Sequence, residues 1–190
     1  RDELGDDWQN AASATVTTDI AKSVEKAQET FVGSTITPVA QIVTQKTDNG
    51  EAYGLLGRIK ATVPNATEKY VFFVIYVRAD GTTEIVEIMD TEFPTNINNI
   101  PYGWYQPESI ELSTEEKAAF DKLMSEMDGV EYKPLAKVAE QVVAGKKVCV
   151  LCESRVVVPN APTTYSFVYV YMGLDGKAEI EDIKVFNPDD

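Results

Sequence analysis

Two matching stretches decide the fold of this chain. Residues 165–171 are YSFVYVY, followed by Asp175-Gly176, and residues 70–76 are YVFFVIY, followed by Asp80-Gly81. Apolar runs of this length, rich in aromatic and β-branched residues, are typical of strands that are covered on both faces. An Asp-Gly pair after such a run is a strong signal for a hairpin turn. Each stretch therefore predicts an antiparallel strand pair.

Both stretches belong to an internal repeat. With a shift of 95 residues, 14 of the 39 positions from 50 to 88 are identical, including Asn65 with Asn160. Upstream the shift is 96, which pairs Trp8 with Trp104. The change of shift places one extra residue in the first copy, between positions 45 and 50. A repeat of this kind predicts two copies of one structural unit.

Each copy contains signals for one helix. In the second copy, Ser113 and Glu116 have the spacing of a capping box, and Gly129 is suited to end the helix. In the first copy, Thr17 or Thr18 starts the helix and Gly33 ends it. The apolar stripes at helical spacing are Ile20, Val24, Ala27 and Phe31 in one copy and Phe120, Leu123, Met124 and Met127 in the other.

Four strand signals follow each helix, separated by turns rich in Gly, Pro, Asn and Asp. They cover residues 37–45, 52–63, 69–78 and 83–89 in the first copy and 132–143, 147–158, 164–172 and 178–186 in the second. No further helix intervenes, which favours an antiparallel meander. We therefore expect an α+β protein with two domains, 1–95 and 96–190, and a proline-containing linker near residues 91–109. Each domain packs one helix on a four-stranded antiparallel sheet.

One helix can cover only one face of each sheet, although the third strand of each copy is apolar on both faces. The second face then needs another cover. Three covers are considered: the neighbouring unit, a second chain in a homodimer through the sheet faces, and a protein partner.

Composition excludes several classes of function. The chain has 190 residues, 17 basic and 31 acidic side chains, a net charge of −14 and no histidine. Nucleic-acid binding needs a basic face, so no such partner is expected. Without histidine there is no His-based triad or His metal site. We identify no phosphate loop, cofactor motif or carboxylate pair tied to a nucleophile, and we expect a non-enzymatic protein with no cofactor, no metal and no membrane span.

The cysteines are Cys149 and Cys152. Both lie in a predicted strand, where residues three apart have Cα atoms about 10 Å apart, beyond the usual disulfide range of about 4.4–6.8 Å. A zinc site would need about four ligands, and the chain has no other Cys or His. We expect buried, unreactive thiols.

The second copy resembles the cystatin family. The sequence Gln141-Val142-Val143-Ala144-Gly145 matches the first-hairpin signature of cystatins, and Gly103-Trp104 is similar to the Gly-Trp trunk of plant-type cystatins. The resemblance implies inhibition of papain-like cysteine proteases by a wedge of trunk, first hairpin and second hairpin. The second hairpin here, residues 173–176, has Leu174 at its tip and lacks the family's Pro-Trp. The first copy has a charged turn in place of the signature.

We therefore expect a secreted, cystatin-like tandem repeat that binds protein, with a papain-like protease as one partner. The candidate contact residues are Gly103, Trp104, Gln141, Val142, Val143, Ala144, Gly145 and Leu174. Three alternatives remain open: an interaction or adhesion module at a bacterial surface, a PepSY-like peptidase regulator, and a small-ligand enzyme or carrier that uses the aromatic sheet face. The chain begins with Arg rather than Met and resembles modules of secreted bacterial proteins, from which we expect an extracellular or cell-surface location.

Overall fold

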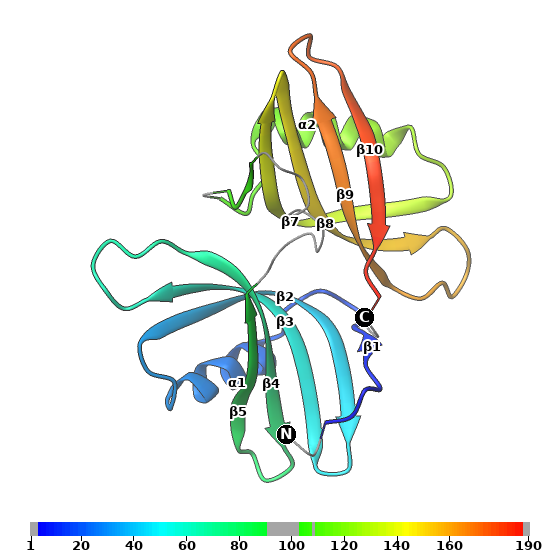
Figure 1. The fold of residues 1–190 in the computed structure, drawn as a ribbon. Coiled ribbons are helices and arrows are strands. Elements are labelled where there is room, and N and C mark those ends of the chain that lie inside the picture. The colour runs from blue at the N-terminus through cyan, green and yellow to red at the C-terminus, as the bar shows by residue number, and fades with distance from the viewer. Residues whose placement is uncertain (1–3, 91–102, 108, 188–190) are drawn as a thin grey trace. The chain divides into compact units, whose positions relative to one another are not determined.

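The computed structural model describes residues 4–90, 103–107 and 109–187 (Figure 1). It divides the chain into two compact units, which we call unit 1 and unit 2. Unit 1 contains α1 and β1–β5, and unit 2 contains α2 and β6–β10. The expected domain boundary at residues 95 and 96 lies outside the described residues, as does most of the expected linker.

Unit 1 is a five-stranded antiparallel sheet with one helix. The strands follow one another across the sheet in the order β1-β2-β3-β4-β5. Its elements are β1 (Gln9–Asn10), α1 (Thr18–Gln28), β2 (Ser34–Thr47), β3 (Gly50–Ala61), β4 (Lys69–Arg78) and β5 (Thr83–Asp90).

Unit 2 repeats this order. Its sheet has the order β10-β9-β8-β7-β6, again antiparallel throughout. Its elements are β6 (Trp104–Tyr105), α2 (Thr114–Ser125), β7 (Val130–Val143), β8 (Gly145–Val156), β9 (Thr164–Met172) and β10 (Ala178–Val185).

Both helices begin where the sequence predicts. The Thr17 hydroxyl accepts a hydrogen bond from the Ile20 N–H at the start of α1. Ser113 and Glu116 form the predicted capping box at the start of α2. Both helices end before the glycines expected to stop them, at Gln28 and Ser125. In the described part of the chain, neither helix has the length and apolar composition that a bilayer crossing requires.

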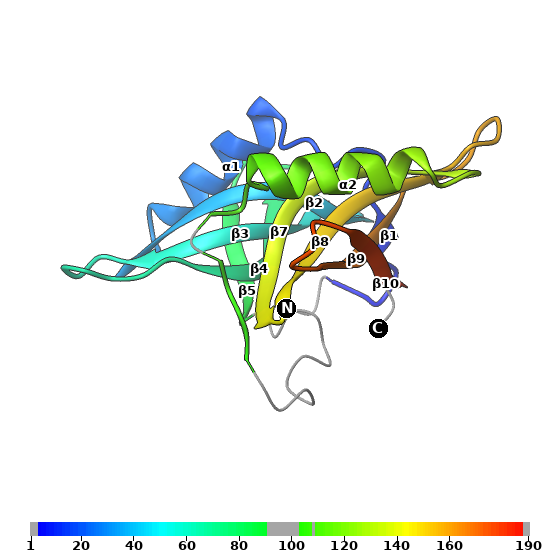
Figure 2. The same ribbon diagram turned by 90° about the horizontal axis from the view of Figure 1, so that it is seen from above.

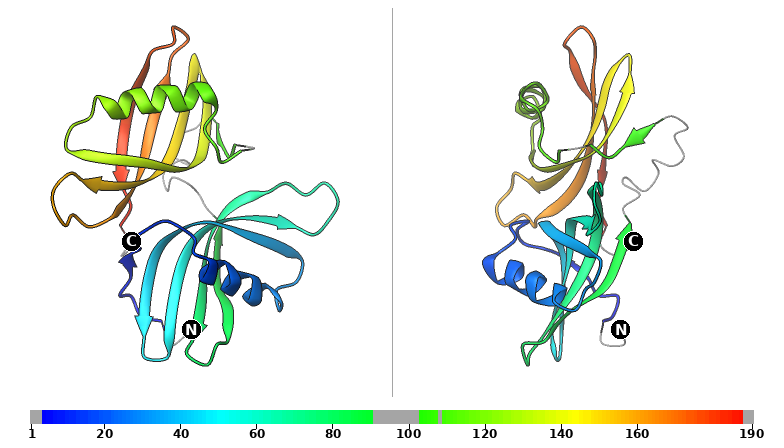
Figure 3. Two further views of the ribbon diagram at one scale, coloured as in Figure 1. Left: turned by 180° about the vertical axis from the view of Figure 1, so that it is seen from behind. Right: turned by 90° about the vertical axis from the view of Figure 1, so that its left-hand side faces the viewer.

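Each helix lies across one face of its own sheet (Figure 3), and its apolar side packs against that face. In unit 1 the buried cluster joins Ile20 and Val24 of α1 to Leu55, Phe73 and Ile75 of the strands. In unit 2 the buried cluster contains residues of α2, β8 and β9: Phe120, Val148, Val150, Cys152, Val168 and Val170. Burial of these side chains is the main force that holds helix and sheet together.

The two units have β-bulges at equivalent positions, in addition to equivalent strands. Each long second strand carries two β-bulges, at residues 38–40 and 41–43 of β2 and at residues 134–136 and 137–139 of β7. These positions differ by 96 residues, the shift found in the sequence. Bulges bend a strand and increase its twist, in keeping with the curved sheets of Figure 2. The extra residue of the first copy lies in the β2–β3 turn, where Thr47 faces Gly50 across two turn residues, whereas Val143 faces Gly145 across one.

The predicted fold class, α+β with two cystatin-like units of one helix and a four-stranded sheet each, is wrong. The structure is mostly β, with 51% of residues in strands, two five-stranded antiparallel sheets and only two helices among the described residues. The fifth strand of each sheet is the two-residue strand before the helix, β1 or β6. Two residues give no alternation of polar and apolar side chains, so periodicity does not reveal them.

The second face of the unit 1 sheet is covered in part by the segment before α1. There, Ala52, Val74 and Tyr76 form a buried cluster against which Leu4 and Trp8 pack. This cover was not among the three considered from the sequence. A homodimer through the sheet faces stays a prediction.

Candidate functional site

The predicted contact residues of unit 2 lie at one end of its sheet, where β7 turns into β8 and β9 turns into β10 (Figure 1). The β7–β8 turn is tight, because Val143 and Gly145 are paired with only Ala144 between them. Gly145 has a φ of +104°, and a Cβ atom there would lie 2.3 Å from the main-chain oxygen of Met172. Only glycine tolerates both the positive φ and the close approach of the Met172 oxygen, so this turn requires glycine at position 145.

The β9–β10 turn lies beside the β7–β8 turn and is connected to it. The Tyr171 hydroxyl donates a hydrogen bond of 2.6 Å to the Ala144 carbonyl. Within the second turn, the Gly173 N–H bonds the Lys177 carbonyl at 2.8 Å, and the Gly176 N–H bonds the Gly173 carbonyl at 3.1 Å. These bonds hold both turns in one conformation.

The short strand β6 is paired to β7 close to the β7–β8 turn. Trp104 is in register with Gln141, two residues before Val143. The Trp104 ring meets the Tyr169 ring edge to face, with centroids 5.8 Å apart and an angle of 87°. Gln141 is buried and Trp104 is half-buried, while Gly103 is exposed with a φ of +76°. Trp104 and Gln141 therefore stabilise this end of the sheet through strand pairing and packing and present little surface to a partner.

Three aliphatic side chains are exposed at the turns. The exposed fractions are 72% for Val142, 37% for Val143 and 85% for Leu174. We call Val142, Val143, Ala144 and Leu174 the turn edge. Exposed aliphatic side chains on a rigid support lose little conformational freedom when a partner covers them.

The corresponding turns of unit 1 are charged. Lys46 occupies the position of Val142, and Asp48 follows in the turn itself. In the β4–β5 turn Ala79 stands where unit 2 has Leu174. Asp80, the counterpart of Asp175, accepts hydrogen bonds of 2.9 and 2.7 Å from the N–H and hydroxyl of Thr82, which hold the pKa of its carboxyl below the usual value. The turn edge is thus a property of unit 2.

A buried ion network lies between α2 and the sheet of unit 2. Glu116 Oε1 accepts a hydrogen bond of 2.9 Å from Lys137 Nζ, and Glu116 Oε2 lies 2.7 Å from Lys146 Nζ. Lys137 Nζ also lies 2.5 Å from Glu140 Oε1. Burial opposes ionisation of Glu116, but Lys146, the Ser113 N–H and Lys137 together outweigh it and lower the pKa to about 2. The Glu140 and Glu116 carboxylates likewise outweigh the burial of Lys137 and raise its pKa.

Sequence reasoning missed this network, since it assigned Glu116 only to the helix cap. A signal was present in the repeat. Position 116 corresponds to Ile20, a core residue of unit 1, and Lys137 corresponds to Gln41. A replacement of an apolar core residue by glutamate indicates a buried partner of opposite charge.

Cys149 and Cys152 are free and fully buried, as predicted. Burial raises the pKa of both thiols far above the usual value. Among the described residues, no group of three or more Cys, Asp or Glu side chains is arranged to hold a metal ion.

Comparison with known proteins adds no relative to these observations. No protein-family model matches the chain, and no curated protein matches it.

Proposed function

We propose that unit 2 is a protein-binding module whose turn edge inserts into a cleft of a partner protein. The observation that carries the proposal is the adjacency of two rigid turns that expose Val142, Val143 and Leu174. Covering a Val or Leu side chain completely is worth about 1.5–3 kcal/mol. Val142 and Leu174 can each contribute close to this amount, and Val143, which is 37% exposed, contributes less; the rest of the contact offsets the cost of association.

The difference between the two units supports this assignment. Where unit 2 exposes Val142 and Val143, unit 1 has Lys46 in the strand and Asp48 in the turn. Charged tips resist transfer into a dry cleft, because charged groups lose their hydration there. In unit 2 the side chains of the turn edge carry no charge, and the carboxylate beside them is that of Asp175 in the β9–β10 turn.

A papain-like cysteine protease is the first partner to test, because the sequence of the first hairpin resembles that of the cystatins. Inhibition of papain by the full chain is measured at about micromolar concentration, the range in which a modest specific complex forms. Val142→Asp places a charge at the tip, and we expect it to weaken inhibition at least about tenfold. Lys46→Asp, at the equivalent position of unit 1, is the matched control and leaves inhibition unchanged.

Gly145 is not a suitable test position. A side chain there would collide with the Met172 carbonyl and disturb the sheet itself, whereas Val142 points to solvent. Absence of inhibition by the unmodified chain would exclude papain-like proteases. Equal inhibition by the Val142→Asp variant would exclude the turn edge as the contact.

A further inference from the structure

The first residues of β7, at the end of the strand opposite the turn edge, differ from the first residues of β2 in unit 1. There the outer edge of β2 is closed by a side chain of α1. Gln28 Nε2 donates a hydrogen bond of 2.8 Å to the Ile36 carbonyl, and the Ile36 N–H donates one of 2.8 Å to Gln28 Oε1. A carboxamide offers one donor and one acceptor side by side, as a peptide group does. Gln28 therefore occupies the place that an added strand would take.

Unit 2 lacks this closure. Met124 stands where unit 1 has Gln28, and Tyr132 stands where unit 1 has Ile36. A thioether donates no hydrogen bond and accepts only weakly. The side chain that satisfies the edge in unit 1 therefore has no functional counterpart in unit 2.

The hydrogen bonds between β7 and β8 show which main-chain groups of β7 point away from β8. The Val157 N–H bonds the Gly129 carbonyl at 2.9 Å, so the alternation of an antiparallel pair directs the N–H and C=O of Val130 and Tyr132 away from β8. On that outer side β6 pairs only with Glu140 and Gln141. Within residues 4–90, 103–107 and 109–187, no hydrogen bond joins the outward groups of Val130 or Tyr132 to another residue.

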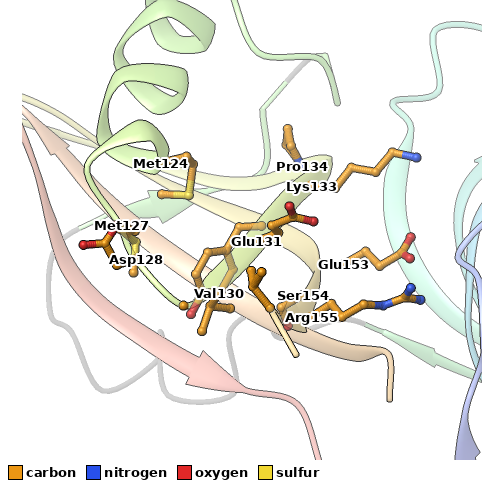
Figure 4. A pocket seen from close by; sticks show the side chains of 13 residues that line it. Met124, Met127, Asp128, Val130, Glu131, Lys133, Pro134, Glu153, Ser154 and Arg155 are labelled. Atoms are coloured by element: carbon orange, nitrogen blue, oxygen red, sulfur yellow. The ribbon is translucent and has the colours of Figure 1, made fainter. Parts of the chain in front are cut away.

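A cavity of about 920 Å³ lies along this edge (Figure 4). Its size is in the upper range of ligand pockets. Apolar side chains from the end of α2, from the segment between α2 and β7, from β7 and from the segment after β8 contribute to its wall: Met124, Met127, Val130, Tyr132, Pro134 and Val157. An open strand edge beside a partly apolar cavity has the form of a peptide-binding groove.

The charges around this edge restrict the charge of a segment that could bind there. Across the strand pair, Glu131 faces Arg155 and Lys133 faces Glu153, so these charges balance, while Asp128 adds one negative charge. The whole chain carries −14, which repels acidic segments and a second copy of itself. The edge thus favours an uncharged or basic segment of another protein.

We propose that residues 130–134 of β7 bind an extended, uncharged or basic peptide segment of a partner protein as an added strand. Its main chain bonds the N–H and C=O of Tyr132, as the Gln28 carboxamide bonds Ile36, and one of its apolar side chains enters the cavity beside Met124. This site is separate from the turn edge, and the papain assay does not bear on it.

The probe is a synthetic peptide of sequence KTVLVTK with blocked ends, titrated into the ¹⁵N-labelled full chain to about millimolar concentration, which detects weak binding. The main-chain amide signals of Val130 and Tyr132 are expected to shift and to exchange more slowly with D2O. A peptide of the same sequence with N-methylated central residues lacks the required donors, and we expect it to bind about tenfold more weakly.

Two variants exchange the equivalent residues of the two units, Met124→Gln and Gln28→Met, and Met124→Leu is the control. Met124→Gln introduces the closing carboxamide of unit 1, and we expect about tenfold weaker binding, equivalent to about 1.4 kcal/mol. Met124→Leu keeps an apolar side chain and binds as the unmodified chain does. Gln28→Met opens the unit 1 edge and raises the stoichiometry from one peptide to two.

The proposal is overturned if the amide signals of Val130 and Tyr132 do not respond to the peptide, or if Met124→Gln binds as tightly as Met124→Leu. Sedimentation of the unmodified chain tests whether a second copy of the chain occupies the edge instead. A dimer that Met124→Gln dissociates would assign the edge to a second copy of the chain and also overturn the proposal.

Discussion

Replacement of Glu116 by glutamine gives the most direct test of the buried network in unit 2. Glutamine has the shape of the protonated acid, so the variant removes the charge and keeps a side chain of the same length. Lys137 and Lys146 then lose the carboxylate that they share. The side chain of Glu116 is fully buried, and solvent therefore does not replace the lost interaction.

The size of the effect follows from the pKa of Glu116. The pKa falls from 4.5 to about 2 in the folded protein, and one pKa unit corresponds to about 1.4 kcal/mol. The ionised carboxylate therefore contributes about 3 kcal/mol to the stability of unit 2 at neutral pH. A depressed pKa stabilises the fold above the unfolded value, and the contribution is lost as pH falls from about 4.5 toward about 2. We expect Glu116→Gln to cost about 3 kcal/mol at neutral pH and almost nothing near pH 2.

Urea unfolding followed by tryptophan fluorescence measures this difference. Each unit has one tryptophan, Trp8 or Trp104, so a Trp8→Phe background reports on unit 2 alone. Asp121→Asn is the matched control, because Asp121 pairs with Lys117 at the surface of α2. Exposed pairs contribute only about 0.2–1 kcal/mol.

Two results would refute the reasoning. One is a loss below about 1 kcal/mol for Glu116→Gln at neutral pH, since that is the range of a surface pair. The other is a loss of equal size at every pH, which would indicate a packing defect rather than a missing charge.

Three further predictions concern unit 2. Cys149 and Cys152 do not react with Ellman's reagent until urea unfolds the unit, because burial raises the pKa of both thiols; rapid reaction in the native state would contradict this. Gly145→Ala costs about 2 kcal/mol or more in urea unfolding, whereas Gly176→Ala, with no atom within 4 Å of its Cβ position, costs about 1 kcal/mol; equal losses would refute the argument from close approach. Phe120→Ala removes the main contact of α2 with the sheet and costs about 3–5 kcal/mol by the same measurement; a loss below about 1 kcal/mol would show that α2 is held by other contacts.

The sequence predicts the longer elements well. Thr17, Ser113 and Glu116 mark the helix starts because capping is a local interaction between neighbouring residues. The strands from β2 to β5 and from β7 to β10 are recognised by their apolar runs and by the turns between them. The repeat strengthens each assignment, because two copies with different residues give the same pattern.

Sequence reasoning fails where the pattern is short or interrupted. The two residues of β6 are assigned to a strand only by their pairing with β7, which is a long-range contact. In β7 the residues 136–139 are all buried, because bulges break the alternation, and Lys137 thus faces the buried side without any local signal. The open edge at Tyr132 becomes visible only through comparison with the hydrogen bonds of Gln28.

The paired bulges of β2 and β7 also set a rule for changes of length. Each bulge reverses the side of the sheet to which all later side chains of the strand point, and a second bulge restores it. Deleting one residue at a single bulge would turn the rest of the strand inside out. Deleting one residue at each bulge would keep both ends of the strand in phase and make the strand straighter. Insertions and deletions in these two strands are therefore tolerated in pairs, and the loops carry the single-residue changes, as the extra residue of the β2–β3 turn already does.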